Sequence, residues 1–242
     1  RDSDDVELKR LADYVYEKVF LHYTTKQWGM KPEDLDPSVT GRVPVSISRD
    51  DRYFQDAYQG MPADGYTRMI ERMLDHPNIK LLLNTDYREA LETDWSTGAI
   101  RLFGQPFEGK LIFTGKIDEL FDYEYGELPY RSLRFEFETL HQSQYQPVGT
   151  VNYPNEYDFT RITEFKHLTG QRHPYTAIVR EYPQAYEKNT PGRDIPYYPI
   201  PRPENQERYK LYLKKAQTFD NLILLGRLAE YTYYDMDACV AK

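Results

Sequence analysis

The sequence lacks the features that mark secreted, membrane-inserted or nucleic-acid-binding proteins. Its 242 residues include one cysteine, Cys239, so no internal disulfide can form and a reducing cytoplasm is the expected location. No run of about 18 apolar residues occurs, and we expect no membrane insertion. The formal net charge of −8 leaves no broad basic field, which argues against nucleic acid as a partner.

The familiar catalytic and cofactor motifs are also missing. Residues 104–111 have the spacing of a phosphate loop, but Leu111 replaces the Ser or Thr that would hold magnesium, and a strand is expected there instead of a helix. The five histidines show no paired-ligand spacing, so we expect no metal site. No G-x-S-x-G elbow occurs, no carboxylate pair stands out, and G-x-G-x-x-G is absent from the whole chain.

Apolar periodicity predicts a protein of mixed α and β structure. Helical spacing favours helices at 5–21, after Asp64 and Gly65, and at 206–217. Near-continuous apolar runs of the buried-strand type occupy IKLLLN from Ile79, KLIFTG from Lys110, and 222–225. Alternation of apolar and polar residues over 131–182 predicts antiparallel strands with one solvated face, and 38–54 and 191–203 are expected to be extended or loop segments.

Tyrosine is abundant, and it collects with arginine at predicted strand ends and loop edges. The chain contains 23 tyrosines, whose flat rings with a polar tip suit nucleotides and sugars, although most of them are expected in the core. Arginine binds phosphate with a planar fork of donors, so two arginines with phenol groups would make a diphosphate clamp. The residues in question are Tyr23, Trp28, Arg42, Tyr53, Phe54, Asn152, Arg161, Tyr197, Tyr198, Arg227, Tyr233 and Asp235.

The last segment is the most informative one. An apolar strand reaches Gly226 and Arg227, a tyrosine cluster follows, and Asp235 opens a predicted helix. Ligands of open α/β sheets collect beyond the carboxyl ends of the strands, where helix starts offer unpaired N–H groups. This segment therefore predicts a place for an anion or a ring oxygen.

Taken in order, these segments resemble the UDP-galactopyranose mutase family. YTTKQW and GRLAEYTYYDMD are the specific matches, and GMPADGYT, LLLNTDY, FTGKIDELFDYEYG, LPYRSLRFE, TRITEF, VREYP and PYYPI follow the order of that family. The resemblance implies a flavoenzyme in which reduced FAD attacks the anomeric carbon of UDP-galactose, so that the six- and five-membered ring forms interconvert. The absent G-x-G-x-x-G implies that the segment cradling the FAD pyrophosphate lies outside this chain, which we expect to be an inactive core fragment unable to retain FAD.

The resemblance also implies a domain plan and a set of residue roles. The expected parts are 1–75 (helical substrate domain), 76–120 (strands of a Rossmann-like FAD domain), 121–190 (inserted antiparallel sheet) and 191–242 (C-terminal part of the FAD domain with the substrate and flavin site). By position, Arg42 and Arg161 would grip the diphosphate, with hydroxyls from Tyr53, Tyr198 and Tyr233. Tyr23 would stack on uracil, Trp28, Phe54, Asn152 and Tyr197 would line the substrate pocket, and Asp235 would lie near the sugar. Gly226, Arg227 and the backbone at Met236 would hold the flavin.

Two other functions remain open. A non-catalytic nucleotide-sugar-binding module would also lack the glycine loop, and a related mutase acting on another nucleotide-linked sugar would share most of these segments. A general FAD amine oxidase fits less well, because such an enzyme needs no diphosphate clamp. UDP-galactose is the expected partner, and a homodimer is expected for the full-length protein.

Overall fold

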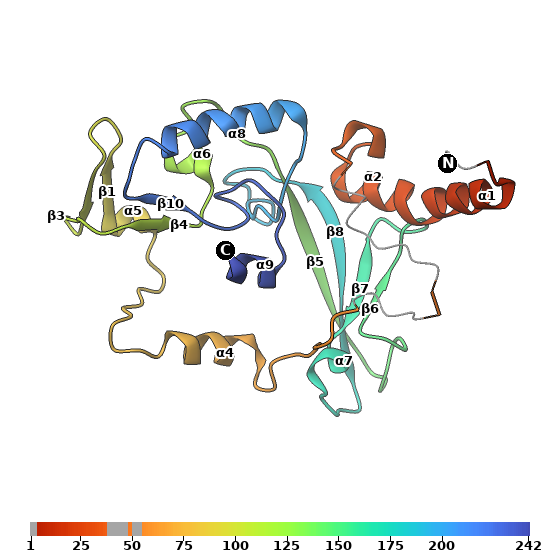
Figure 1. Ribbon diagram of the computed structural model, residues 1–242. Helices are drawn as coiled ribbons and strands as arrows, with labels where there is room; N and C mark the ends of the chain where they lie inside the picture. Colours follow the sequence, from red (N-terminus) through yellow and green to blue (C-terminus); the bar gives the residue numbers. More distant parts are fainter. Residues whose placement is uncertain (1–3, 38–47, 50–54) are drawn as a thin grey trace. The chain divides into compact units, whose positions relative to one another are not determined.

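The computed structural model describes residues 4–37, 48–49 and 55–242. The chain forms two compact units, each assembled from two stretches of sequence. Unit 1 comprises Arg1–Gly65 and Tyr130–Arg202, and unit 2 comprises Tyr66–Pro129 and Pro203–Lys242. Helices and antiparallel strands occur together, which confirms the predicted mixed fold class (Figure 1). The four-part division remains a prediction, and most of the expected extended segment 38–54 lies outside the described residues.

Unit 1 begins with three consecutive helical segments, the first two of which cover the single helix predicted at 5–21. Asp5 accepts hydrogen bonds from the backbone N–H groups of Glu7 and Leu8, which supplies the N-cap that the first turn needs. Gly29 ends the third segment in the left-handed conformation, at φ +69°. The segments are α1 (Val6–Val15), the π-helical η1 (Tyr16–Leu21) and α2 (His22–Trp28), and the short 3₁₀ turn η2 (Pro32–Asp34) follows them.

The rest of unit 1 is a five-stranded antiparallel sheet in the order β6-β7-β8-β5-β9. Its long central pair, β8 and β5, runs side by side along the sheet (Figure 1). Ile162 and Ile178 are at most 1% exposed, so one face of the sheet forms the core that alternation predicts. The strands are β5 (Tyr130–Leu140), β6 (Thr150–Asn152), β7 (Arg161–Glu164), β8 (Thr176–Ala185) and β9 (Tyr198–Pro199), and α7 (Phe165–Thr169) follows β7.

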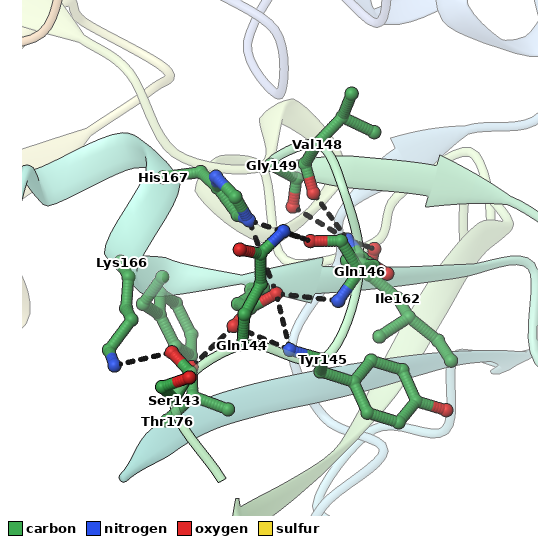
Figure 2. A network of polar contacts seen from close by, with 12 residues as sticks. Ser143, Gln144, Tyr145, Gln146, Val148, Gly149, Ile162, Lys166, His167 and Thr176 are labelled. Atoms are coloured by element: carbon green, nitrogen blue, oxygen red, sulfur yellow. Dashed lines mark hydrogen bonds and ion pairs between the residues drawn. The ribbon is translucent and has the colours of Figure 1, made fainter. Parts of the chain in front are cut away.

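A buried carboxylate fixes the end of β7. Glu164 is 0% exposed and accepts hydrogen bonds from the Thr176 hydroxyl at 2.6 Å and from the backbone N–H groups of Tyr145 and Gln146, at 3.0 and 2.9 Å. Figure 2 shows how the Gln146 amide continues the network, by donating to the carbonyls of Val148, Gly149 and Ile162. Burial alone would raise the pKa of Glu164, but the hydrogen bonds from Thr176 and from these N–H groups outweigh it and lower the pKa.

Unit 2 contains two small sheets and five helices among the described residues. The strands predicted from the apolar runs form at β4 (Leu111–Phe113) and β10 (Leu222–Leu224), which pair in parallel with Ile223 opposite Ile112. The predicted burial is incomplete, because Ile112 and Ile223 are 56% and 38% exposed. α8 (Pro203–Ala216) packs on α6 (Ile117–Leu120) and on β10 (Figure 1). The antiparallel sheet contains β1 (Leu91–Asp94), β2 (Ala99–Leu102) and β3 (Gln105–Pro106), and the remaining helices are α4 (Gly65–Leu74), α5 (Tyr87–Ala90) and α9 (Met236–Ala241), of which α4 starts on the last residue of unit 1. Over the described ranges, no helix combines the length and apolar character that crossing a bilayer requires.

The buried strand predicted at IKLLLN is wrong for this structure. Residues 79–83 form no strand, and the side chains of Leu82 and Leu83 are 56% and 71% exposed. A buried parallel strand forms only where neighbouring strands take up its backbone hydrogen bonds and other layers cover its faces. Within the described part of the chain no strand pairs with this run, so its apolar composition does not lead to burial.

Replacing Glu164 with glutamine tests the buried network. The glutamine side chain would turn its NH₂ group toward the Thr176 hydroxyl or the backbone N–H groups, which are themselves donors and would lose their acceptor. We therefore expect the free energy of unfolding at pH 7 to fall by about 2–3 kcal/mol. Because the pKa of Glu164 is lowered from 4.5 in the folded state, its stabilising effect is present above pH 4.5 and is lost as the pH falls through the folded pKa. Urea denaturation should therefore show a difference between wild type and variant that narrows in acid.

The matched control for this experiment is Glu138→Gln on β5, a strand of the same sheet. Glu138 is exposed and pairs with Arg180 at 2.7 Å, and such a pair contributes less than about 1 kcal/mol. Equal losses for the two variants at pH 7 would show that the Glu164 network does not stabilise the fold.

Candidate functional site

Six of the predicted site residues that the structure describes lie in unit 1, and the sheet brings several of them together. β7 pairs with β6 on one side, where Asn152 lies opposite Arg161, and with β8 on the other, where Glu181 lies opposite Arg161. Tyr23 reaches the same place from α2 and Tyr198 from β9. The six residues are Tyr23, Trp28, Asn152, Arg161, Tyr197 and Tyr198.

Arg161 is the centre of this group. Its Nη2 donates a hydrogen bond to the Tyr23 hydroxyl at 2.8 Å, and its Nε lies 3.5 Å from Glu181 Oε2. The side chain is 33% exposed, and Nε has no hydrogen-bond partner among the residues that the structure describes. Arg161 therefore joins a helix to a strand while it still presents part of its guanidinium group to solvent.

The ionisation of this pair follows from burial and charge together. Burial would lower the pKa of Arg161, but the nearby Tyr23 hydroxyl and Glu181 carboxylate outweigh it, so the pKa is raised and the group stays cationic. Burial raises the pKa of Glu181, and the charge of Arg161 opposes that shift. The site thus combines a permanent cation with a carboxylate that takes up a proton more readily than usual.

Two aromatic residues of the group serve the core as well. Trp28 is 5% exposed and packs against Leu35, and its ring centroid lies 6.1 Å from that of Tyr198. Tyr197 packs edge-on against Phe135 at 5.8 Å, and burial together with the charge of Glu181 raises its pKa. The Trp28 ring therefore fixes where Tyr198 stands.

Arg131 holds the end of the helix that carries Tyr23. It lies on β5, and its Nε and Nη2 donate to the carbonyl oxygens of Gln27 and Lys26 at 2.9 and 3.4 Å. A cation at a helix C-terminus satisfies carbonyls that have no partner inside the helix and interacts favourably with the helix dipole. Arg131 and Glu181 were not predicted from the sequence, because their partners lie far away along the chain.

Five further predicted residues lie in unit 2, after β10. The guanidinium carbon of Arg227 lies 4.4 Å from the centre of the Tyr233 ring, and Arg227 donates to the carbonyl of Tyr234. Asp235 precedes α9, as predicted, although its side chain accepts no capping hydrogen bond, and Met236 is 67% exposed.

Gly226 differs from its neighbours in conformation. It adopts φ +88°, which favours glycine, and a Cβ atom there would meet nothing within 4 Å. Its N–H donates to the Glu230 carboxylate at 2.9 Å. The backbone at the end of β10 is therefore open to close approach by a flat ligand.

The remaining predicted residues, Arg42, Tyr53 and Phe54, lie outside the described residues. Among the residues described, no group of three or more His, Cys, Asp or Glu side chains is placed to hold a metal ion. Each unit has its own group of predicted residues: unit 1 contains a partly exposed cation with phenol groups, and unit 2 contains a cation next in sequence to an open glycine.

Comparison with known proteins gives a consistent match. The family model for UDP-galactopyranose mutase matches residues 18–233. The chain is 38% identical over 238 residues to UDP-galactopyranose mutase of Mycoplasma pneumoniae, with 97% of this chain and 59% of that protein covered. It is 35% identical to dTDP-fucopyranose mutase of Escherichia coli, over 97% of this chain and 60% of that protein. A crystal structure of reduced UDP-galactopyranose mutase matches the fold at TM-score 0.64 and 14% identity, over 90% of this chain and 61% of that chain.

The chain thus spans about three fifths of the length of the curated relatives it matches. The family model covers most of the chain, so the segments of this chain occur in the same order as those of the family. The match to the crystal structure, at 14% identity, shows the fold alone.

Removing Arg161 should destabilise unit 1 by leaving Glu181 without its cation. We expect Arg161→Ala to lower the free energy of unfolding by about 1–3 kcal/mol at neutral pH, less than for a fully buried pair because Arg161 is 33% exposed. Without Arg161 the pKa of Glu181 rises further. The loss in the free energy of unfolding should therefore grow as the pH rises toward that pKa, and it should shrink in acid, where Glu181 is protonated in both states. Denaturation of Arg161→Ala/Glu181→Gln is the control and should recover most of the loss. Equal stability of the two variants at every pH would contradict the pairing.

Proposed function

This chain belongs to the UDP-galactopyranose mutase family, and we propose that it forms the core of an enzyme that interconverts the six- and five-membered ring forms of UDP-galactose. The observation that supports this most directly is the Arg161 group. A charged guanidinium, held by Tyr23 at one end and facing Glu181 at the other, suits a diphosphate that must be gripped and released.

The other substrate roles are proposed from the resemblance to the family. We propose that Arg161 and Arg42 bind the diphosphate, with hydroxyl groups of Tyr53, Tyr198 and Tyr233 as further donors. The Tyr23 ring would stack on uracil, while its hydroxyl accepts a hydrogen bond from Arg161. The sugar and the rest of the nucleotide would contact Trp28, Phe54, Asn152, Tyr197 and Asp235.

The residues after β10 fit the flat ring of a flavin. Gly226 leaves the backbone uncovered, Arg227 is a cation for an electron-rich ring, and the exposed start of α9 at Met236 offers backbone groups. Reduced FAD would supply an electron-rich ring nitrogen that acts as a nucleophile toward the anomeric carbon. The task of the chain's own residues is then to orient the sugar and to hold the diphosphate through its release and return.

A second function is favoured by one relative. The chain is nearly as similar to dTDP-fucopyranose mutase, at 35% identity, as to UDP-galactopyranose mutase, at 38%. A mutase for another nucleotide-linked sugar would need the same diphosphate cation and differ only in contacts to the base and the sugar. A non-catalytic binding module would retain these contacts without turnover.

Replacing Arg161 tests the diphosphate role. We expect Arg161→Ala/Glu181→Gln in the full-length protein to lose more than about 100-fold in turnover, since a loss of about 3 kcal/mol at the transition state has that effect. Arg161→Lys should regain only part, because a point charge keeps the attraction and loses the forked geometry. We expect Arg42→Ala to behave similarly. Arg134→Ala, which removes an exposed arginine paired with Glu136, is the control and should leave turnover unchanged. Turnover near normal in both the Arg161 and Arg42 variants would contradict the clamp.

The redox state of the flavin and the choice of sugar test the reaction. We expect the full-length protein to convert UDP-galactopyranose only after chemical reduction of its flavin, because the oxidised ring lacks the nucleophilic nitrogen.

Chromatographic assays with UDP-galactose and dTDP-fucose at equal concentration should show a higher kcat/KM for UDP-galactose. Preference for dTDP-fucose would establish the second function, equal rates before and after reduction would contradict the covalent role of the flavin, and nucleotide binding without turnover would indicate the binding module.

A further inference from the structure

Lys26 is held by a single loop. Its ammonium group donates hydrogen bonds to three backbone carbonyl oxygens, those of Tyr153, Tyr157 and Phe159, the last two at 2.8 and 3.1 Å. An ammonium group has three N–H donors, so the three carbonyls of this loop use every donor of Lys26. No salt bridge to a carboxylate is found for Lys26 among the described residues, although the charge of Asp158 lies near it.

The loop that binds Lys26 connects the two strands of the candidate site. Residues 153–160 link Asn152 on β6 to Arg161 on β7, and the loop closes at its base where Tyr153 N–H donates to Thr160 O at 2.8 Å. The rings of Tyr157 and Phe159 stack at 4.8 Å. Carbonyls that converge on one point repel each other unless a cation lies between them, so the shape of this loop depends on the ammonium group.

Lys26 lies three residues after Tyr23 on α2. Residues three apart lie on the same side of a helix, so the side of α2 that presents Tyr23 is also the side that Lys26 fastens to the loop. The C-terminal end of the same helix is held to β5 by Arg131. Two cations that donate to backbone carbonyls therefore join α2 to the sheet.

The burial of Lys26 has a cost that these contacts must offset. Burial lowers the pKa of Lys26, because it disfavours the charged form, and the charge of Asp158 opposes the shift only in part. A surface position would carry no such cost. Substitution by an uncharged residue of similar length would remove the donors and leave the three carbonyls facing one another.

We propose that Lys26 is a positioning residue, which fixes α2 against the 153–160 loop so that Tyr23, Asn152 and Arg161 stand in the arrangement that binds the nucleotide. This inference rests on the proposed function for its ligand, while the contact that it invokes lies wholly within unit 1. Lys26 itself would touch neither base nor sugar.

The test uses three variants of the full-length protein: Lys26→Met, Lys26→Arg and the control Lys18→Met. Methionine keeps the apolar stem and removes the donors, arginine keeps charge and donors, and Lys18 is an exposed lysine of η1 paired with Glu17. We expect the Kd for UDP, measured by calorimetry, to rise about tenfold or more in Lys26→Met. It should rise less than about threefold in Lys26→Arg and stay unchanged in Lys18→Met.

A double-mutant cycle separates positioning from general destabilisation. In a Tyr23→Ala background, where the ring to be positioned is gone, Lys26→Met should weaken UDP binding by less than about threefold. A purely structural lysine would give the same factor in both backgrounds, and that result would overturn the inference. So would a Kd for Lys26→Met within about twofold of the wild-type value.

Hydrogen exchange of the backbone amides in residues 153–160 supplies a readout that needs no ligand. We expect faster exchange there in Lys26→Met than in Lys18→Met. If the unaltered protein binds no UDP, the proposed function is wrong, and the role of Lys26 is then judged from hydrogen exchange alone. Unchanged exchange of residues 153–160 in Lys26→Met would overturn this inference too. If Lys26→Met does not fold, Lys26→Gln serves in the same cycle, since glutamine is too short to reach all three carbonyls.

Discussion

The register between β7 and β8 is the constraint on which the candidate site depends. It places Arg161 opposite Glu181, while the pairing with β6 on the other side places Asn152 opposite Arg161. Side chains alternate between the two faces of a strand, so a shift of one residue would send Arg161 to the opposite face and separate it from Tyr23. The buried Glu164 at the far end of the same strand makes that shift costly, because its hydrogen-bond donors come from the preceding loop and from Thr176 on β8.

Three cations around α2 donate hydrogen bonds to uncharged oxygen atoms, although the chain as a whole is acidic. Arg131 and Lys26 donate to backbone carbonyls, and Arg161 donates to a phenol. Among the described residues Arg131 and Lys26 form no salt bridge with a carboxylate, whereas Glu181 lies 3.5 Å from Arg161 Nε and offsets part of its charge. The surroundings of α2 therefore remain favourable to an anion although the chain as a whole carries a net charge of −8.

The elements predicted best from the sequence are those whose pattern is long. Alternation over 131–182 identified the antiparallel strands, and helical spacing identified α1, α4 and α8. Strands β1 to β3, of two to four residues each, carry too little pattern to be recognised. The IKLLLN run shows the converse, since composition indicates what a segment can bury and not whether partner strands are present.

The kinds of residue in the site were predicted better than the contacts between them. Tyr23 and Arg161 were selected as separate residues, and their hydrogen bond spans 138 positions of sequence. Glu181 and Lys26 were overlooked for the same reason: a glutamate in a strand or a lysine in a helix has no distinctive neighbours until folding supplies them. Long-range pairings of this kind give no periodic signal, so pattern analysis misses them.

The interleaving of the two units has a consequence for how the chain is made. Unit 2 begins at Tyr66 but is interrupted by Tyr130–Arg202, and its parallel pair joins β4 to β10 near the C-terminus. During synthesis β4 emerges from the ribosome long before its partner, and α2 likewise waits for the loop that binds Lys26. Domains generally fold as units during synthesis, and a strand edge left open meanwhile is prone to aggregation. The edge of β4 therefore stays open while the residues between it and β10 are made, and the speed of translation and the supply of chaperones affect how often that edge aggregates.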